Sequence, residues 1–448
     1  MPQKSFFLIA TAVLIFLFWI THKDSPPIGP PLDRDRNRAS DVSEFSKLPG
    51  ADLPCRHLPG AEDVVVIMKT GSTELQDKLP IHLSTTLRCY PNYAIFSDFE
   101  EEYHGEHIFD ALDSVDPWIR DNNPDFELWR RLRDQGGRHA LKPSERSGPI
   151  SRPQATNTGK PSNPGWKVDK WKFLPMMNRT LVEYPEMKWY LFVETDTYVM
   201  WQTFLNYIRA LDWTKPYYVG GQIWIGDIVF AHGGTGFAVS RPALQQVVNM
   251  FREHQKEWED FTNSHWAGDC VLGKAFKDAG APLTYAWPIW QADDVGDMNY
   301  DRVDNGHRLW CKPSVSWHHL SPSVVEDMWN FEQEWIGKNK EDPEKILHHK
   351  DVYREYVLPR IQKPKRDWNN HADRDEGPVH DLEACMHICE AQHDCVQYAL
   401  SIDLRCLTTA RPNLGEVSRG TDSGWVVDRM EKYADSQSWC TGDNGWIT

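Results

Sequence analysis

Residues 189–193 form an unbroken apolar run that leads directly into an acidic pair, Glu194 and Asp196. A short continuous apolar run is typical of a strand that is buried on both faces. Residues 64–68 and 93–96 form two more such runs, and the stretch between them can form a helix. This β-α-β alternation predicts an α/β fold with a mixed, mostly parallel sheet, in which ligands bind beyond the carboxyl ends of the strands.

The one-residue spacing between Glu194 and Asp196 suits the binding of a metal ion. Two carboxylates placed in this way can offer oxygen ligands to one hard cation, Mn²⁺ or Mg²⁺. Such a cation would hold diphosphate oxygens and stabilise a departing nucleoside diphosphate. A solvated turn after a strand can have the same residues, so the spacing by itself does not establish a metal site.

The size and charge of the chain limit the class of protein. The chain has 448 residues and a formal net charge of −16. That length exceeds one ordinary core and predicts a large domain with a smaller one beside it in the sequence. An acidic surface repels phosphate backbones, so we expect no nucleic-acid partner.

The amino-terminal segment predicts a membrane anchor, because residues 6–20 are uncharged and apolar and no small-residue cleavage site follows them. We expect residues 1–5 to be a cytoplasmic tail, residues 6–21 an uncleaved signal anchor and residues 22–60 a Pro-rich stem. A cleaved signal peptide is the alternative. The favoured case is a single-pass type II protein of the Golgi or endoplasmic reticulum membrane with a lumenal catalytic domain, and the glycosylation sequon at Asn178 agrees with it.

The nine cysteines predict a disulfide framework in an oxidising compartment. Cys55 with Cys89, and Cys270 with Cys311, are candidate pairs, and the odd number leaves one thiol over. The sequence has no C-x2-C pair, which is the spacing expected of a zinc site. We expect a catalytic-type domain at residues 61–345 with a flexible insertion at 134–165, a linker at 346–374 and a cysteine-rich domain at 375–448.

Four segments together carry a more specific pattern. Residues 189–199 read WYLFVETDTYV, residues 233–241 read GGTGFAVSR, residues 268–273 read GDCVLG, and residues 317–320 read WHHL. In this order they resemble the motifs of glycosyltransferase family 31, which includes the Fringe enzymes and the core 1 β1,3-galactosyltransferases. The resemblance covers about residues 61–330. It departs from the family where Glu194 and Thr195 replace two Asp residues and where Gly268 replaces an acidic residue.

This resemblance implies a GT-A fold that binds a UDP-sugar with Mn²⁺ and transfers the sugar with inversion, usually forming a β1,3 linkage. Asp196 would be a metal ligand, with Glu194 and His318 as further ligands and His319 as the alternative to His318. Asp269 would be the general base that takes the proton of the acceptor hydroxyl, although an Asp here also suits a helix N-cap. We expect a hexose donor, with galactose favoured, and a glycan or glycoprotein acceptor.

Four charged residues are candidates for contacts with the donor. Asp98 follows a predicted strand and could contact the nucleoside, and Arg88 could meet phosphate. Lys170 and Lys172 lie in a stretch that resembles the Lys-rich helix of the family. Either lysine could neutralise diphosphate, although a solvated helix face explains them as well.

Two glycines and a tryptophan complete the candidate site. Gly233 and Gly234 would let the backbone approach a ligand closely, and a packing role at a strand-turn-helix junction is equally compatible with them. Trp224 is a candidate for stacking on the acceptor, or else a core residue.

The cysteine-rich tail has the spacing C-x3-C-x5-C-x10-C, and it resembles a PAN/Apple module. Cys385 and Cys389 lie one helical turn apart and face the same side. By this resemblance Cys385 would pair with Cys406, and Cys389 with Cys395. Such modules bind protein or carbohydrate, and a purely structural role is equally compatible with the sequence.

Three functions remain open at this level. The first is an active transferase anchored in the membrane. The second is a transferase fold without activity that acts as a lectin or adaptor through its PAN-like tail. The third is a glycoside hydrolase, which also uses two carboxylates but needs no nucleotide.

Overall fold

The computed structural model describes residues 53–147, 163–304, 306–436, 440 and 445–447. The predicted cytoplasmic tail and anchor and most of the predicted stem lie outside these residues. The end of the predicted stem contains the short helix η1 (Pro54–His57), in which Cys55 is bonded to Cys89. Within the described part of the chain, no helix is both long and apolar enough to span a membrane.

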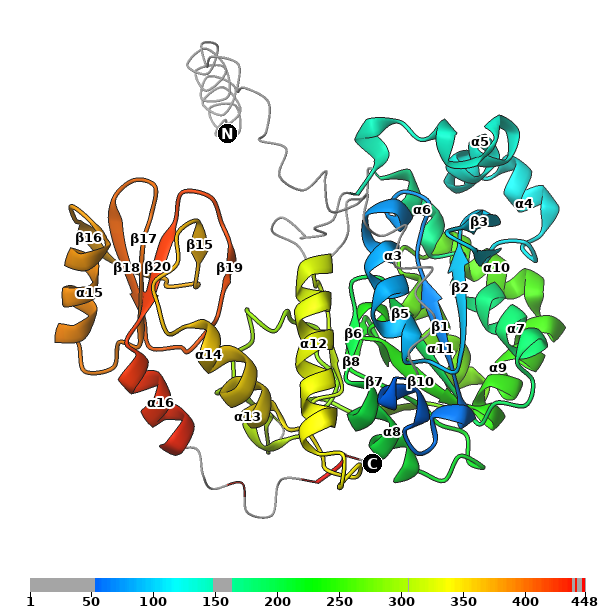
Figure 1. Ribbon diagram of the computed structural model, residues 1–448. Helices are drawn as coiled ribbons and strands as arrows, with labels where there is room; N and C mark the ends of the chain where they lie inside the picture. The colour runs from blue at the N-terminus through cyan, green and yellow to red at the C-terminus, as the bar shows by residue number, and fades with distance from the viewer. Residues whose placement is uncertain (1–52, 148–162, 305, 437–439, 441–444, 448) are drawn as a thin grey trace, which may run out of the picture. The chain divides into compact units, whose positions relative to one another are not determined.

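An eight-stranded mixed sheet lies within the larger part of the chain, at the right of Figure 1, with the strand order β11-β7-β10-β5-β1-β2-β4-β3. Four neighbouring pairs are parallel (β1–β2, β1–β5, β2–β4 and β7–β11) and three are antiparallel. The predicted mixed α/β architecture is therefore confirmed. The strands are β1 (Val64–Lys69), β2 (Asn92–Ser97), β3 (Glu101–Tyr103), β4 (Glu106–Asp110), β5 (Trp189–Glu194), β7 (Tyr218–Gly220), β10 (Phe237–Ser240) and β11 (Leu283–Tyr285).

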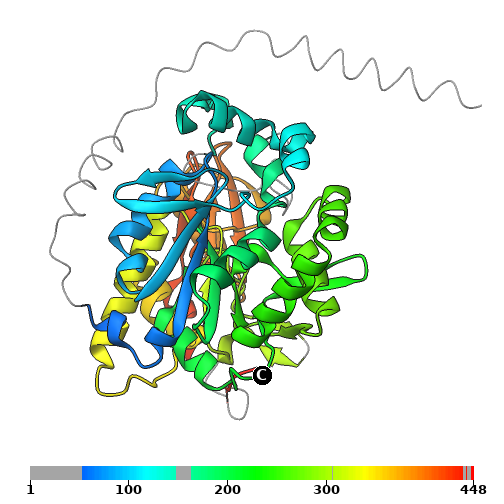
Figure 2. The ribbon, with the colours of Figure 1, turned by 90° about the vertical axis from the view of Figure 1, so that its right-hand side faces the viewer.

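The central strand β1 is buried on both faces, as its unbroken apolar sequence predicts. Val64, Val66 and Met68 belong to one core, together with residues of α3 (Leu75–Ser84) and α8 (Trp201–Arg209). Val65 and Ile67 belong to a second core, with α7 (Phe173–Glu183), α9 (Arg241–Glu253) and α11 (Gly268–Asp278). Successive side chains of a strand point to opposite faces, and helices accordingly cover the sheet on both sides (Figure 2).

Short antiparallel pairs accompany the main sheet. β6 (Tyr198–Val199) pairs with β14 (Ser316–Trp317), and β8 (Gln222–Ile225) forms a hairpin with β9 (Ile228–Ala231). The predicted strand at residues 228–230 thus exists but lies in the hairpin. The short helix η7 (Gly233–Thr235) then connects β9 to β10.

Two segments are more ordered than their composition predicts. The expected linker contains α13 (His349–Val352), η9 (Tyr353–Val357) and α14 (Leu358–Arg360). Its Val352, Tyr353 and Tyr356 are buried in one core with α12 (Pro322–Lys338), because large apolar side chains override the many charges around them. The expected insertion contains η5 (Gly137–Ala140), η6 (Pro143–Glu145) and the start of α6 (Pro164–Asp169), and its residues 148–162 lie outside the described part.

The carboxyl-terminal region holds a four-stranded antiparallel sheet of order β16-β18-β17-β20, against which α15 (Leu382–Ala391) packs. The disulfides Cys385–Cys406 and Cys389–Cys395 are both present, and all four cysteines are buried. The strands are β16 (Arg374–Pro378), β17 (Gln397–Leu400), β18 (Arg405–Thr409) and β20 (Asp422–Trp425); β15 (Trp368–Asn369) pairs with β19 (Glu416–Val417), and α16 (Val427–Ser436) follows.

The predicted pair Cys270–Cys311 is wrong. Cys311 is bonded to Cys440, and Cys270 is a buried free thiol in the first turn of α11. The predicted pair Cys55–Cys89 is confirmed. Cysteine spacing carries no information on which distant partners meet, so the tertiary fold alone selects Cys440.

Removal of the bond between Cys311 and Cys440 should destabilise the chain. The bond joins residues 129 positions apart, and a cross-link over so long a loop restricts the unfolded state strongly. We expect Cys311→Ser with Cys440→Ser to lower the free energy of unfolding by about 2–5 kcal/mol, measured as a fall in Tm. Cys270→Ser, which removes the unpaired thiol, is the control, and equal Tm values for the two variants would contradict the expectation.

Candidate metal and acid-base site

The pairing of β6 with β14 brings Asp196 next to His318. Tyr198 lies opposite Trp317 in this pair, and the backbone N–H of Leu320 donates to the carbonyl oxygen of Asp196 at 3.0 Å. The Oδ1 atom of Asp196 lies 3.3 Å from Nε2 of His318. The segment after β5 and the segment after β14 therefore meet at the carboxyl edge of the sheet, where ligands bind in such folds.

Asp196, His318 and His319 are the group of metal-ligating side chains found among the described residues, and their ligand atoms all lie within 4.8 Å of one another. The Nδ1 atoms of both histidines are buried without a hydrogen-bond partner in the described structure. His319 has a φ of 60°, the left-handed conformation that costs a non-glycine residue about 1–2 kcal/mol. Strained backbone and unpartnered polar atoms concentrate at functional sites.

The protonation states of Asp196 and His319 suit a metal ion. Burial, together with the neighbouring His318, lowers the pKa of His319 to about 4 and that of His232 to about 3. The His232 ring centroid lies 5.3 Å from that of His318. Burial alone would raise the pKa of Asp196, but Lys78 and His318 outweigh it and hold that pKa well below its usual range. Ionised carboxylate and neutral imidazole are the forms that bind metals.

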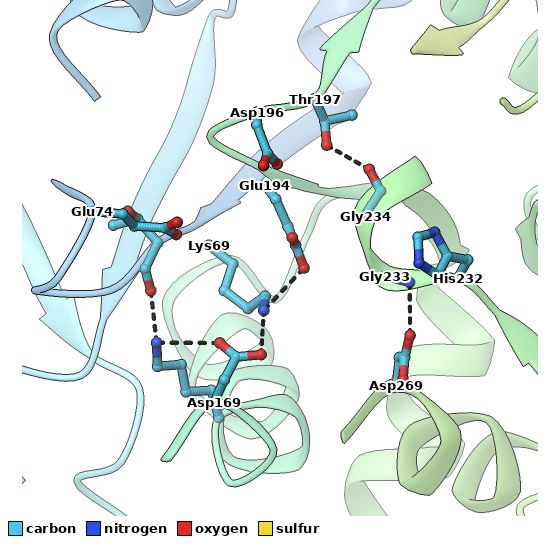
Figure 3. Close-up of polar contacts among 12 residues, drawn as sticks. Lys69, Glu74, Asp169, Glu194, Asp196, Thr197, His232, Gly233, Gly234 and Asp269 are labelled. Atoms are coloured by element: carbon cyan, nitrogen blue, oxygen red, sulfur yellow. Dashed lines mark hydrogen bonds and ion pairs between the residues drawn. The ribbon is translucent and has the colours of Figure 1, made fainter. Parts of the chain in front are cut away.

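Lys69 lies between two carboxylates (Figure 3), with its Nζ atom 2.7 Å from Oδ2 of Asp169 and 3.0 Å from Oε1 of Glu194. Lys69 and Glu194 are directly opposite each other in the register of β1 and β5. Burial would lower the pKa of Lys69, but the two carboxylates outweigh it and raise that pKa, so the group is charged. Glu194 is therefore held by a lysine and lies outside the group of metal-ligating side chains.

Helix α3 holds the other side of the acidic loop. The Nζ atom of Lys78 lies 2.9 Å from Oδ2 of Asp196 and 2.9 Å from Oε2 of Glu74. The side chain of Lys78 is almost wholly buried. One turn further along the helix, Nε2 of His82 donates to the carbonyl oxygen of Thr195 at 2.9 Å. These contacts fix the loop that carries Asp196.

Asp98 and Lys172 are both buried and make polar contacts with the loop that follows β1. Oδ1 of Asp98 accepts hydrogen bonds from the backbone N–H of Ser72 at 2.7 Å and from its hydroxyl at 2.5 Å. Lys172 donates to the carbonyl oxygen of Thr70 at 2.8 Å, and its Nζ atom lies 3.3 Å from Oδ1 of Asp169 and 3.9 Å from Oδ2 of Asp98. Both side chains thus stabilise the loop that follows β1.

Asp269 lies on the other flank of Glu194, in the first turn of α11 (Figure 3). Its Oδ2 atom accepts a hydrogen bond from the backbone N–H of Gly233 at 3.0 Å, and Oδ1 accepts from that of Cys270 at 2.9 Å. Burial, aided by the charge of Glu194, raises the pKa of Asp269 to about 6, although the two hydrogen bonds oppose the change. The helix N-cap is Ala267, so Asp269 does not serve as that cap.

Two glycines are required by close contacts in the site. A Cβ atom at Gly234 would overlap the imidazole of His318, and a Cβ atom at Gly268 would come within 2.6 Å of the Cα atom of Lys170. The hydroxyl of Thr197 also donates to the carbonyl oxygen of Gly234 at 2.5 Å. At Gly268, therefore, the packing leaves no room for an acidic side chain.

Gly234→Ala tests whether the glycine turn positions His318. The added methyl group should displace the imidazole from Asp196 and lower the free energy of unfolding by about 2 kcal/mol. We expect Mn²⁺ binding, measured by calorimetry on the full chain, to weaken with it. Gly337→Ala in α12 is the matched control, since a methyl group there meets no atom within 4 Å; equal behaviour of the two variants would contradict the proposed contact.

Three candidate residues from the sequence lie outside this cluster. Arg88 precedes β2 in η3 (Thr86–Arg88), so it lies at the opposite end of that strand from Asp98. Lys170 donates to the carbonyl oxygens of Asn263 and His265 and so holds a turn. Trp224 lies on the β8–β9 hairpin with 67% of its surface exposed.

Sequence reasoning missed Lys69, Lys78, Asp169 and His232. Lys69 offered a signal, because it follows the apolar run of β1 just as Glu194 follows that of β5. Lys78 stands four residues after Glu74, a spacing that predicts an ion pair on a helix. This spacing does not predict that Asp196 also pairs with Lys78. Nothing in the local sequence marks Asp169 or His232.

No protein-family model matches this chain, and no curated protein is significantly similar to it. Its function is therefore inferred from the residues of the site.

Proposed function

We propose that this protein is a nucleotide-sugar-dependent glycosyltransferase. In particular, it would move a hexose, galactose first among the candidates, from a UDP-sugar to a glycan or glycoprotein acceptor. One observation supports this most: Asp196, on the loop after β5, meets His318 and His319 at the carboxyl edge of a partly parallel sheet, and Glu194, at the end of β5, neighbours Asp269. A cation site and a carboxylate of raised pKa are the two groups that such a transfer needs.

The charge balance of the site favours a divalent cation. Six carboxylates gather here against three ammonium groups, and the excess of negative charge would repel a diphosphate unless a cation offset it. When bound, the cation would neutralise the diphosphate that leaves with the nucleoside. Asp196, His318 and His319 would hold it. The carboxylates are Glu74, Asp98, Asp169, Glu194, Asp196 and Asp269, and the ammonium groups belong to Lys69, Lys78 and Lys172.

Asp269 would act as the general base. Its pKa near 6 leaves it ionised at neutral pH and still basic enough to accept the proton of an acceptor hydroxyl. The backbone N–H groups of Gly233 and Cys270 hold the carboxylate in place. In an inverting transfer this proton removal accompanies the departure of UDP from the opposite face of the sugar.

The finer assignments belong to the same proposal. The larger domain would be a GT-A fold of the glycosyltransferase family 31 type, forming a β1,3 linkage. The disulfide-bonded tail would be a PAN/Apple-like module that takes a protein or carbohydrate ligand. The whole would be a type II protein of the Golgi or endoplasmic reticulum membrane. Their support is the order of the four sequence motifs and the disulfide pattern of the tail.

A second candidate is a transferase fold without activity that serves as a lectin or adaptor. The observation in its favour is that both carboxylates of the acidic pair already have a lysine partner, Lys69 for Glu194 and Lys78 for Asp196. Lysines in these positions could replace the cation and leave a stable but inactive site.

Donor binding separates the two candidates. We expect UDP to raise the Tm of the full-length protein only when Mn²⁺ is present, and we expect slow, Mn²⁺-dependent hydrolysis of UDP-galactose, UDP-glucose or UDP-N-acetylglucosamine. Addition of EDTA should abolish both effects. An unchanged Tm and no hydrolysis with any of the three donors would favour the lectin or adaptor.

A further inference from the structure

Two tryptophans, Trp166 and Trp266, form an aromatic pair on the surface. The ring centroids of Trp166 and Trp266 lie 6.4 Å apart, and their planes differ by 22°. Trp266 exposes 48% of its surface, and Trp166 is partly exposed. Large indole surfaces kept in water lose the stabilisation that burial would give them, so an exposed pair calls for an explanation beyond folding.

The backbone beside each tryptophan is closely packed. A Cβ atom at Gly165, beside Trp166, would lie 2.5 Å from the hydroxyl oxygen of Thr73. Gly268, two residues after Trp266, is equally confined by the backbone of Lys170. Close backbone contacts of this kind are not needed for side chains on a mobile loop. They are expected where a binding surface is formed before its ligand arrives.

Lys170 links the two segments that carry the pair. It follows α6, the helix of Trp166, and its Nζ atom donates to the carbonyl oxygens of Asn263 and His265 at 3.3 and 3.0 Å. His265 immediately precedes Trp266 in the chain. The lysine therefore fixes the position of one indole relative to the other, so that the pair behaves as a single surface.

The pair is connected to the acid-base side of the site. Trp166 stands three residues before Asp169 in α6, and Asp169 shares Lys69 with Glu194. Trp266 stands three residues before Asp269, the proposed base. Each indole therefore stands three residues from one of these carboxylates in the chain.

We propose that Trp166 and Trp266 form a stacking platform for the pyranose ring of the acceptor glycan. This proposal rests on the proposed function, because the hydroxyl to be deprotonated must lie at Asp269. The C–H face of a pyranose packs on an indole ring, and a rigid aromatic surface loses little conformational entropy when the sugar binds. Trp224, the candidate from the sequence, would then have no part in acceptor binding.

Saturation-transfer NMR on the full-length protein tests the platform without any transfer reaction. The probes are the methyl glycosides of galactose, glucose, mannose and N-acetylglucosamine. We expect at least one to bind, and Trp166→Ala and Trp266→Ala each to weaken that binding about tenfold. Trp266→Phe keeps an aromatic face and should stay within about threefold of the wild type. Trp118→Ala removes an indole that is 72% exposed elsewhere and serves as the matched control.

Each outcome decides the proposal. Wild-type binding in both alanine variants, a loss in Trp224→Ala alone, or no binding of any glycoside to the wild type would overturn the platform. The Mn²⁺-dependent effect of UDP on Tm, measured on the same samples, reports the donor site separately. Platform-dependent glycoside binding without a UDP effect would retain the platform and reject the transferase, whereas the converse would reject only the platform.

Discussion

Asp196→Asn is expected to lower the rate of sugar transfer about a thousandfold and to abolish Mn²⁺ binding. Asp196 contributes the only carboxylate of the metal-ligating group in the described residues, and an amide in its place is a neutral and weaker ligand. The rate is measured with saturating UDP-sugar, and metal binding by calorimetry. A variant that keeps Mn²⁺ binding and transfers at more than a tenth of the wild-type rate would remove the metal from the proposal.

Stability must be separated from activity in this variant. Lys78 is buried and would keep only Glu74 as its partner, so we expect a loss of about 3 kcal/mol in the free energy of unfolding. Adding Lys78→Met removes the incompletely paired charge and should restore most of the Tm. The double variant should remain inactive. Recovered activity would show that the first substitution acted through folding alone.

Asp269→Asn should slow transfer about a thousandfold, because an amide cannot accept the proton of the acceptor hydroxyl. The binding of UDP with Mn²⁺ should be unchanged, since Asp269 contacts the backbone of Gly233 and Cys270 and lies outside the metal-ligating group. Asp278→Asn, an exposed position at the end of the same helix, is the control. Full turnover by Asp269→Asn would assign the base to another residue.

The pH dependence of the wild type gives a second measure of the same role. The acting base is the ionised carboxylate, and burial raises the pKa of Asp269 to about 6. Transfer, measured as kcat/KM, should therefore fall about tenfold for each unit of pH below about 6 and level off above it. A profile without this acid limb would contradict the role of Asp269.

The strands of the sheet were largely predictable because their signal is local. Residues 64–68, 93–96 and 189–193 are continuous apolar runs, and all three became largely buried strands, with the first paired in parallel to each of the other two. Within the expected linker at 346–374, Tyr353 and Tyr356 are buried in a core, which the charged composition of this segment does not indicate. Local patterns indicate what a segment can form, but not which distant core accepts its side chains.

The residues of the candidate site were likewise only partly predictable from the sequence. Asp196 and Asp269 could be named from motifs, and the structure places each in a setting that suits its proposed role. Glu194 was expected to bind metal, but its carboxylate lies against Lys69, which faces it across two paired strands. No spacing within one segment predicts such a partner, because it depends on the register between strands.

By itself the sequence determined where strands end and which polar residues follow them, since an apolar run with its flanking residues is a property of a few consecutive positions. Only the tertiary structure decided that Lys78 would hold Asp196 over a separation of 118 residues, that β6 would pair with β14, and that Cys311 would bond to Cys440. Contacts of this kind form because buried charges and unpaired backbone groups must find partners. Buried groups find these partners only when distant segments of the chain have packed together.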